Sequence, residues 1–88
     1  MGADVYLNST MDPTVLGQIL TRMATHHGFT LAFLACKGLK LFPHSMHAPQ
    51  LEGEQLYQCR FLGKETLTPL LEALDQEFPW VQCQKLLS

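Results

Sequence analysis

Four histidines and three cysteines are the residues of this sequence that could bind a metal ion. His44 and His47 have the two-residue gap that many ligand pairs use, but a zinc or copper site needs three or four ligands. The loop around them offers no cysteine or carboxylate at a matching spacing. His26 and His27 end an expected helix, where an imidazolium favours the negative end of the dipole. We predict surface histidines and no metal site, and metal handling by His44 and His47 is the weakest alternative.

Covalent or cofactor chemistry would need residues that this sequence does not place together. Cys36, Cys59 and Cys83 form no Cys-x-x-Cys motif, so we predict buried small hydrophobic side chains in place of redox thiols. A nucleophile would need a histidine held beside it, and the sequence indicates none. The glycines lack the spacing of a phosphate-binding loop. We therefore predict no catalytic residue and no cofactor, so the chain is not expected to be an enzyme on its own.

Arg60 is the charged residue that stands out, because it interrupts the apolar alternation of Tyr57, Cys59 and Phe61. One interpretation is that Arg60 projects from the solvent face of a strand, or pairs there with an acid on a neighbouring strand. The other interpretation is an anchor at a protein interface, where Arg and Tyr are enriched. We name Tyr57, Arg60, Phe61 and Leu34 as candidate interface residues.

Hydrophobic periodicity and turn residues locate the elements that would position these side chains. A short strand at Val5–Leu7 precedes a helix that Asp12 and Pro13 begin and Gly28 ends. The Lys37-Gly38 pair indicates a bulge or a tight turn. Three further strands are expected, at Phe29–Cys36 (resuming at Leu39–Phe42), Gln55–Leu62 and Trp80–Leu86. An exposed loop is expected at Pro43–Glu54. A second helix is expected to begin near Thr66 or Thr68-Pro69 and to end at Pro79.

The strand from Phe29 to Cys36 is apolar on both of its faces. Alternation places one set of side chains on one face (Phe29, Leu31, Phe33, Ala35) and the other set on the opposite face (Thr30, Ala32, Leu34, Cys36). We therefore expect this strand at the centre of the sheet, covered on both sides by this domain, or on one side by a partner.

The order strand, helix, strand, strand, helix, strand predicts an α+β fold. We expect a ferredoxin-like βαββαβ sandwich, with two helices on one face of an antiparallel sheet, because this arrangement buries both helical stripes. The chain of 88 residues is expected to form a single accessory or interaction domain, residues 1–88, with one small core. Cover from a protein partner would stabilise so small a core.

Composition argues against several classes of partner. The net charge of −2 comes from six basic and eight acidic residues without a basic run, so nucleic acid finds little to bind. The apolar stretches are far shorter than the roughly 20 residues that span a bilayer, so we expect no membrane segment. Three scattered cysteines do not form the dense, even framework of secreted domains, which favours the cytoplasm.

Several segments resemble, in the same order, the accessory C-terminal domain of larger bacterial isocitrate dehydrogenases. They are Ala3–Leu7, Asp12-Pro13 with Val15–Gly17, Phe29–Leu31 through Lys37-Gly38 to Leu41–Pro43, Tyr57–Leu62 and Phe78–Leu86. The resemblance spans nearly the whole chain. The chain departs from the family pattern in its loop, in its second helix and before Tyr57, where Gln55 and Leu56 replace an acid and a histidine. Any polar contact that the family's acid and histidine make is therefore not carried over to this chain.

The resemblance implies that isocitrate, the divalent metal and the nicotinamide cofactor bind the preceding catalytic domain, so none of those site residues is carried over to this chain. It implies a role in subunit association or oligomerisation, in an NADP-dependent isocitrate dehydrogenase of which this chain is a part or a homologue. The partner would be a second copy or the catalytic domain. The alternative function is sensing of a small molecule, such as an amino acid, in a groove between strands and helices.

Overall fold

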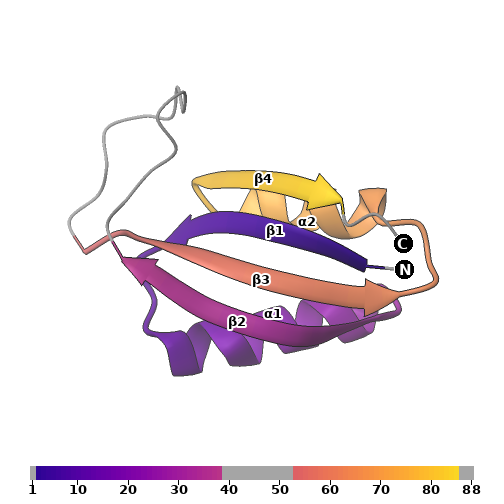
Figure 1. Cartoon of the computed structure of the whole chain (residues 1–88), viewed down its shortest axis with the longest axis horizontal. Helices are drawn as coiled ribbons and strands as arrows, with labels where there is room; N and C mark the ends of the chain where they lie inside the picture. Colours follow the sequence, from indigo (N-terminus) through magenta and orange to yellow (C-terminus); the bar gives the residue numbers. More distant parts are fainter. Residues whose placement is uncertain (1, 39–52, 86–88) are drawn as a thin grey trace.

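The computed structural model describes residues 2–38 and 53–85. They form β1 (Gly2–Ser9), α1 (Pro13–His26), β2 (Phe29–Gly38), β3 (Gln55–Gly63), α2 (Thr68–Glu77) and β4 (Trp80–Lys85). The strands make one antiparallel sheet in the order β2-β3-β1-β4, and both helices lie on the same face of it (Figure 1). The predicted ferredoxin-like βαββαβ fold is therefore confirmed. The predicted strand at 39–42, the loop through residue 52 and Leu86 lie outside the described residues.

Helix α1 begins and ends at the residues that the sequence indicated. The Asp12 carboxylate accepts hydrogen bonds from the backbone N–H groups of Thr14 (2.9 Å) and Val15 (3.0 Å), which satisfies two of the donors that a helix start leaves open. At the other end Gly28 has a φ of +81°, the left-handed conformation that glycine adopts without strain. The helix buries Leu16, Leu20 and Ala24 against the sheet.

Helix α2 lacks such a side-chain cap. Its cap position holds Leu67, which makes no side-chain hydrogen bond to the helix, and the helix relies on Pro69 near its start and on burial of Leu70 and Leu74. It ends at Glu77, with Phe78 as its C-cap, before Pro79 could break the hydrogen-bond pattern. In the described part of the chain no helix has the length and hydropathy that a membrane crossing requires.

The core lies between the two helices and the face of the sheet that they cover. Val5 and Leu7 of β1 pair across the strands with Cys59 and Tyr57 of β3, and all four side chains are fully buried. Burial of one such apolar side chain contributes about 1.5–3 kcal/mol to the free energy of unfolding. The other buried members of this core are Leu16, Leu20, Ala24, Phe29, Phe61, Leu70, Leu74 and Phe78.

The strand expected at the centre of the sheet lies at its edge. Among the described strands β2 pairs with β3 alone, and β1 and β3 occupy the centre. The expectation of a central strand was wrong because apolar faces indicate cover above and below a strand and do not fix how many neighbouring strands it has. On the face without helices Phe33 keeps 44% of its surface exposed.

A bulge in β2 also changes which side chains share a face. The pairing with β3 shifts between Leu31 and Phe33, so Ala32 has no partner opposite it. As a result Leu31 and Leu34 both pack against the core, whereas simple alternation placed them on opposite faces. Phe33 then lies opposite Arg60, on the face of the sheet without helices. A second irregularity between Cys36 and Gly38 confirms the break predicted at Lys37-Gly38.

Candidate functional site

Arg60 forms a two-point ion pair with Asp4 on the face of the sheet that the helices leave uncovered. The two residues lie directly opposite each other on β3 and β1. The Arg60 Nε donates to Asp4 Oδ1 at 2.8 Å, and Nη2 donates to Oδ2 at 3.2 Å. A two-point contact between guanidinium and carboxylate fixes both groups in one plane. The predicted pairing of Arg60 with an acid on a neighbouring strand is confirmed.

The ion pair keeps Asp4 charged. The hydrogen bond from Arg60 lowers the pKa of the Asp4 carboxyl below its ordinary value of 3.8, against the opposing effect of burial, and the positive charge of Arg60 lowers it further. The same hydrogen bond raises the pKa of Arg60. At neutral pH both groups are therefore ionised, and their charges cancel locally.

Phe33 extends this pair into a row of three side chains across three strands. The guanidinium carbon of Arg60 lies 6.0 Å from the centre of the Phe33 ring, at the outer limit of a cation–π contact. Leu62, two residues after Arg60 on β3, has 43% of its surface exposed. Because both side chains are large and apolar, water contact with them is unfavourable.

We call this side of the sheet, on which neither helix lies, the open face; Figure 1 is drawn with it toward the reader and the helices behind. Strand alternation and the observed register assign its members. They are Thr30, Phe33 and Ala35 of β2, Leu56, Gln58, Arg60 and Leu62 of β3, Gly2, Asp4, Tyr6 and Asn8 of β1, and Trp80, Gln82 and Gln84 of β4.

The other three predicted interface residues lie on the opposite side of the sheet. Tyr57 and Phe61 are fully buried in the core, and the Tyr57 hydroxyl donates to the backbone carbonyl of Met11 at 2.8 Å. Leu34 is half-buried and faces α1, where a Cβ at Gly17 would lie 3.5 Å from its Cδ2. Tyr57 and Phe61 thus support the fold from inside. A partner contact stays a prediction for Arg60 and Leu34.

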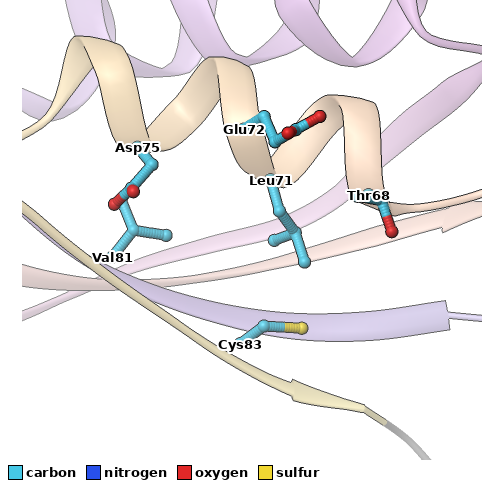
Figure 2. A pocket seen from close by; sticks show the side chains of 6 residues that line it. All are labelled: Thr68, Leu71, Glu72, Asp75, Val81 and Cys83. Atoms are coloured by element: carbon cyan, nitrogen blue, oxygen red, sulfur yellow. The ribbon is translucent and has the colours of Figure 1, made fainter.

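Each edge strand forms a shallow groove with the helix beside it. The groove between α2 and β4, about 260 Å³ in volume, has an apolar floor of Leu71, Val81 and Cys83. Figure 2 shows Leu71 pointing from the helix toward the strands, and Asp75 reaching toward Val81. The polar lining residues are Thr68, Glu72 and Asp75.

The groove at the other edge, between α1 and β2, differs in charge. Leu31 and Leu34 lie at its base, and its charged lining residue is Arg22. Thr14, Gln18 and Thr21 line the rest of it together with Pro13 and Gly17. The two edges of the domain are therefore lined by side chains of opposite charge.

The cysteines differ in burial and in the chemistry open to them. Cys59 is fully buried, and its thiol donates to the Val5 carbonyl at 3.3 Å. Burial raises the pKa of the Cys59 thiol to about 12, so it stays protonated and unreactive. The prediction of a buried cysteine is confirmed for Cys59 and wrong for Cys36, which is exposed near the end of the edge strand. Cys83 is half-buried in the α2/β4 groove.

The predicted surface histidines are only partly within the described structure. His26 and His27 end α1 with their rings 5.1 Å apart, edge to face, while His44 and His47 lie outside the described residues. Within residues 2–38 and 53–85, no group of three or more His, Cys, Asp or Glu side chains could hold a metal ion.

The fold and the open face define a small α+β domain of the ferredoxin-like class, with helices on one side of the sheet and an apolar, ion-paired surface on the other. Residues 1–88 match the family model described as "Bacterial isocitrate dehydrogenase, C-terminal domain", and the chain belongs to this family. It is therefore homologous to one part of bacterial isocitrate dehydrogenase.

A solved structure of a longer protein contains a similar domain. The TT0538 protein from Thermus thermophilus is 25% identical to this chain and aligns with a TM-score of 0.67. The alignment covers 96% of this chain and 18% of that protein, so the chain corresponds to less than a fifth of its length. A comparison with curated proteins found no match.

Proposed function

We propose that this chain is a non-catalytic association domain of a bacterial isocitrate dehydrogenase, and that it binds protein through its open face. The observation that carries this proposal is the exposure of Phe33 and Leu62 on the face that neither helix covers. These two side chains flank Arg60, and both Phe and Arg are enriched at protein interfaces relative to the rest of the surface. A partner that covered them would remove apolar surface from water.

The family supports a division of labour within a longer enzyme. The family description places this domain at the C-terminal end of the dehydrogenase, and the similar structure is more than five times as long as this chain. In our proposal the remainder of the enzyme binds isocitrate, metal and NADP in the cytoplasm. The accessory domain then contributes contacts between subunits.

Binding measurements on matched surface variants test the proposal. Sedimentation would be measured for the 88-residue chain alone and mixed with an isocitrate dehydrogenase that lacks this domain. Phe33→Ser should reduce association at least about tenfold, since it removes a large apolar contact. Val15→Ser is the control, because Val15 is equally exposed, at 43%, but lies on α1. Equal binding by the two variants, or no association of the unaltered chain in either experiment, would contradict the proposal.

The alternative function, sensing of a small molecule, has a candidate site in the α2/β4 groove. Glu72 and Asp75 beside the apolar floor of that groove offer acceptors for the amino group of an amino acid. A saturable rise in melting temperature with added amino acids, absent in Asp75→Asn, would support this function. Unchanged melting across such a panel would remove it.

A further inference from the structure

The two edge strands of the sheet differ in regularity. The register of β2 against β3 shifts twice, whereas β4 pairs with β1 without a shift over its whole length. Bulges and charged side chains protect an edge against the addition of another strand, and residues 80–84 of β4 carry no charge. Among the described strands β4 has β1 as its single neighbour, so every second residue directs its backbone N–H and C=O groups away from the sheet. The β4 edge is therefore better suited than the β2 edge to accept a further strand.

The groove beside the β4 edge combines an apolar floor with an acidic margin. Leu71, Val81 and Cys83 form the floor, and Glu72 and Asp75 of α2 lie beside it. Figure 2 shows Asp75 reaching toward Val81 of β4. All the charged residues of α2 are acids, so the helix attracts cations along this edge. With a volume of about 260 Å³ the groove is smaller than the roughly 300–1,000 Å³ of typical small-molecule sites, which favours the side chains of a protein as its occupants.

Lysine and arginine side chains match both parts of this groove. Their stems are apolar and lie along apolar surface, while the charged group at the end stays in water or meets an acid. In an extended strand beside β4, side chains two residues apart lie on the same side, about 6.6 Å from each other. Val81 and Cys83 have the same spacing on β4 and both line the groove. Two basic side chains at alternate positions would therefore lie over the floor and reach Glu72 and Asp75.

We infer that the β4 edge binds an extended basic segment of a partner protein, which adds a strand to the sheet and directs alternate Lys or Arg side chains into the α2/β4 groove. The described strands of this chain each carry at most one basic residue, so a second copy offers no such segment along them. The occupant is therefore a segment of a different protein. The inference does not depend on the open face, because an added strand lies beside the sheet and leaves that face as it is.

Fluorescence anisotropy of a labelled peptide tests this inference on the 88-residue chain. The probe is a peptide of about eight residues that alternates lysine with valine and has blocked ends. It should bind saturably below about 1 mM, and added salt should weaken the binding because the lysines pair with exposed acids. Glu72→Gln combined with Asp75→Asn should weaken binding about fivefold to tenfold. Glu77→Gln is the matched control and should bind like the unaltered chain, because Glu77 is an acid of α2 that does not line the groove.

Two further peptides separate the addition of a strand from simple attraction between charges. The same peptide with N-methylated backbone amides keeps its charge but loses its hydrogen-bond donors, so it should bind at least about tenfold more weakly. A peptide that alternates glutamate with valine should not bind. Binding of the lysine peptide should also slow backbone hydrogen exchange in β4 and leave β2 unchanged. Circular dichroism checks that each variant of the chain folds.

Several outcomes would overturn the inference. They are the absence of saturable binding, equal binding by the double variant and Glu77→Gln, and undiminished binding of the methylated peptide. Free lysine that bound as tightly as the peptide would also overturn it, and would support the small-molecule alternative. Self-association of the chain that the double variant abolished would instead assign the groove to a second copy. Phe33→Ser should bind the peptide normally, so the outcome here is separate from that of the proposed function.

Discussion

The covered face and the open face of this sheet are built from alternate residues of the same four strands, yet they differ in the exposure of their large apolar side chains and in charge. On the covered face Val5, Tyr57 and Phe61 expose none of their surface. On the open face Phe33 and Leu62 expose more than two-fifths of theirs, whereas Asp4, Leu56 and Asn8 of the same face are buried. Both helices lie on the covered face, and the ion pair lies on the open one (Figure 1).

In our proposal this difference separates stability from recognition within one small domain. The covered face supplies the apolar burial that offsets the conformational entropy lost on folding. The open face contributes less burial, so its side chains can change with a smaller effect on the fold. In our proposal that freedom is used for contact with a second subunit.

The largest expected effect comes from truncating one phenylalanine on each face. Phe61→Ala should lower the free energy of unfolding by about 3–5 kcal/mol, since it leaves a cavity in the core. Phe33→Ala should lower it by about 1 kcal/mol or less, because much of that ring already contacts water. Urea unfolding measures both. If Phe61→Ala does not fold, Phe61→Leu gives a smaller, measurable loss. Equal losses at the two positions would contradict the assignment of the faces.

A smaller effect is expected from adding a methyl group to the covered face at the end of β3. In Gly63→Ala the new Cβ would lie 2.6 Å from the Phe29 ring and 2.8 Å from the Gly28 carbonyl oxygen. Overpacking of this kind should lower the free energy of unfolding by about 1–3 kcal/mol. In Gly17→Ala the Cβ meets only Leu34, at 3.5 Å, and a helix interior prefers alanine. This control should raise the stability by about 0.5–1 kcal/mol, and thermal melting distinguishes the two signs.

The smallest expected effect is a pH dependence that arises on the open face. The pKa of Asp4 is lowered on folding by the hydrogen bond from Arg60, so the unfolded state binds more protons than the folded state near that pKa. The stabilisation by Asp4 is therefore present above pH 3.8, its ordinary pKa, and is lost as the pH falls through the lower, folded value. The unaltered chain should melt at a higher temperature than Asp4→Asn at pH 7, by a margin that shrinks below pH 3.8.

The matching control for the titration of Asp4 is the removal of its ion-pair partner, Arg60. Arg60→Gln should abolish the same pH-dependent part of the stability, because the lowered pKa of Asp4 depends first on Arg60. A melting difference between the unaltered chain and Asp4→Asn that stayed constant from pH 7 to pH 3 would show that the ion pair does not form in solution.

Local sequence signals located the elements well. Asp12 and Pro13 begin α1, Gly28 ends the turn after it, and Pro79 follows the end of α2, because capping and backbone constraints act within a few residues. The alternation around Arg60 likewise predicted β3 and the outward direction of that side chain. The first strand is longer than the predicted Val5–Leu7, since Gly2 and Ser9 pair with β3 whatever their own propensities.

The open face could be predicted only in part. The alternation in β3 identifies Arg60, but its partner Asp4 precedes it by 56 residues and lies opposite it only in the final register. A period of two predicts Phe33 on the same face as Leu31, and the bulge at Ala32 separates them. Residue type alone predicts Tyr57 and Phe61 as interface residues, whereas their direction in β3 places them in the core.

By itself the sequence determined the order of the elements and the ferredoxin-like class, because these follow from periodicity, caps and turn residues. The family is likewise identified from sequence, through the match of residues 1–88 to the family model. The tertiary structure alone decided that β2 lies at an edge, that Leu34 faces the helix while Phe33 faces outward, and that Asp4 meets Arg60. These features depend on register between distant strands. A shift of one residue in that register moves a side chain to the other face, and local sequence does not fix such a shift.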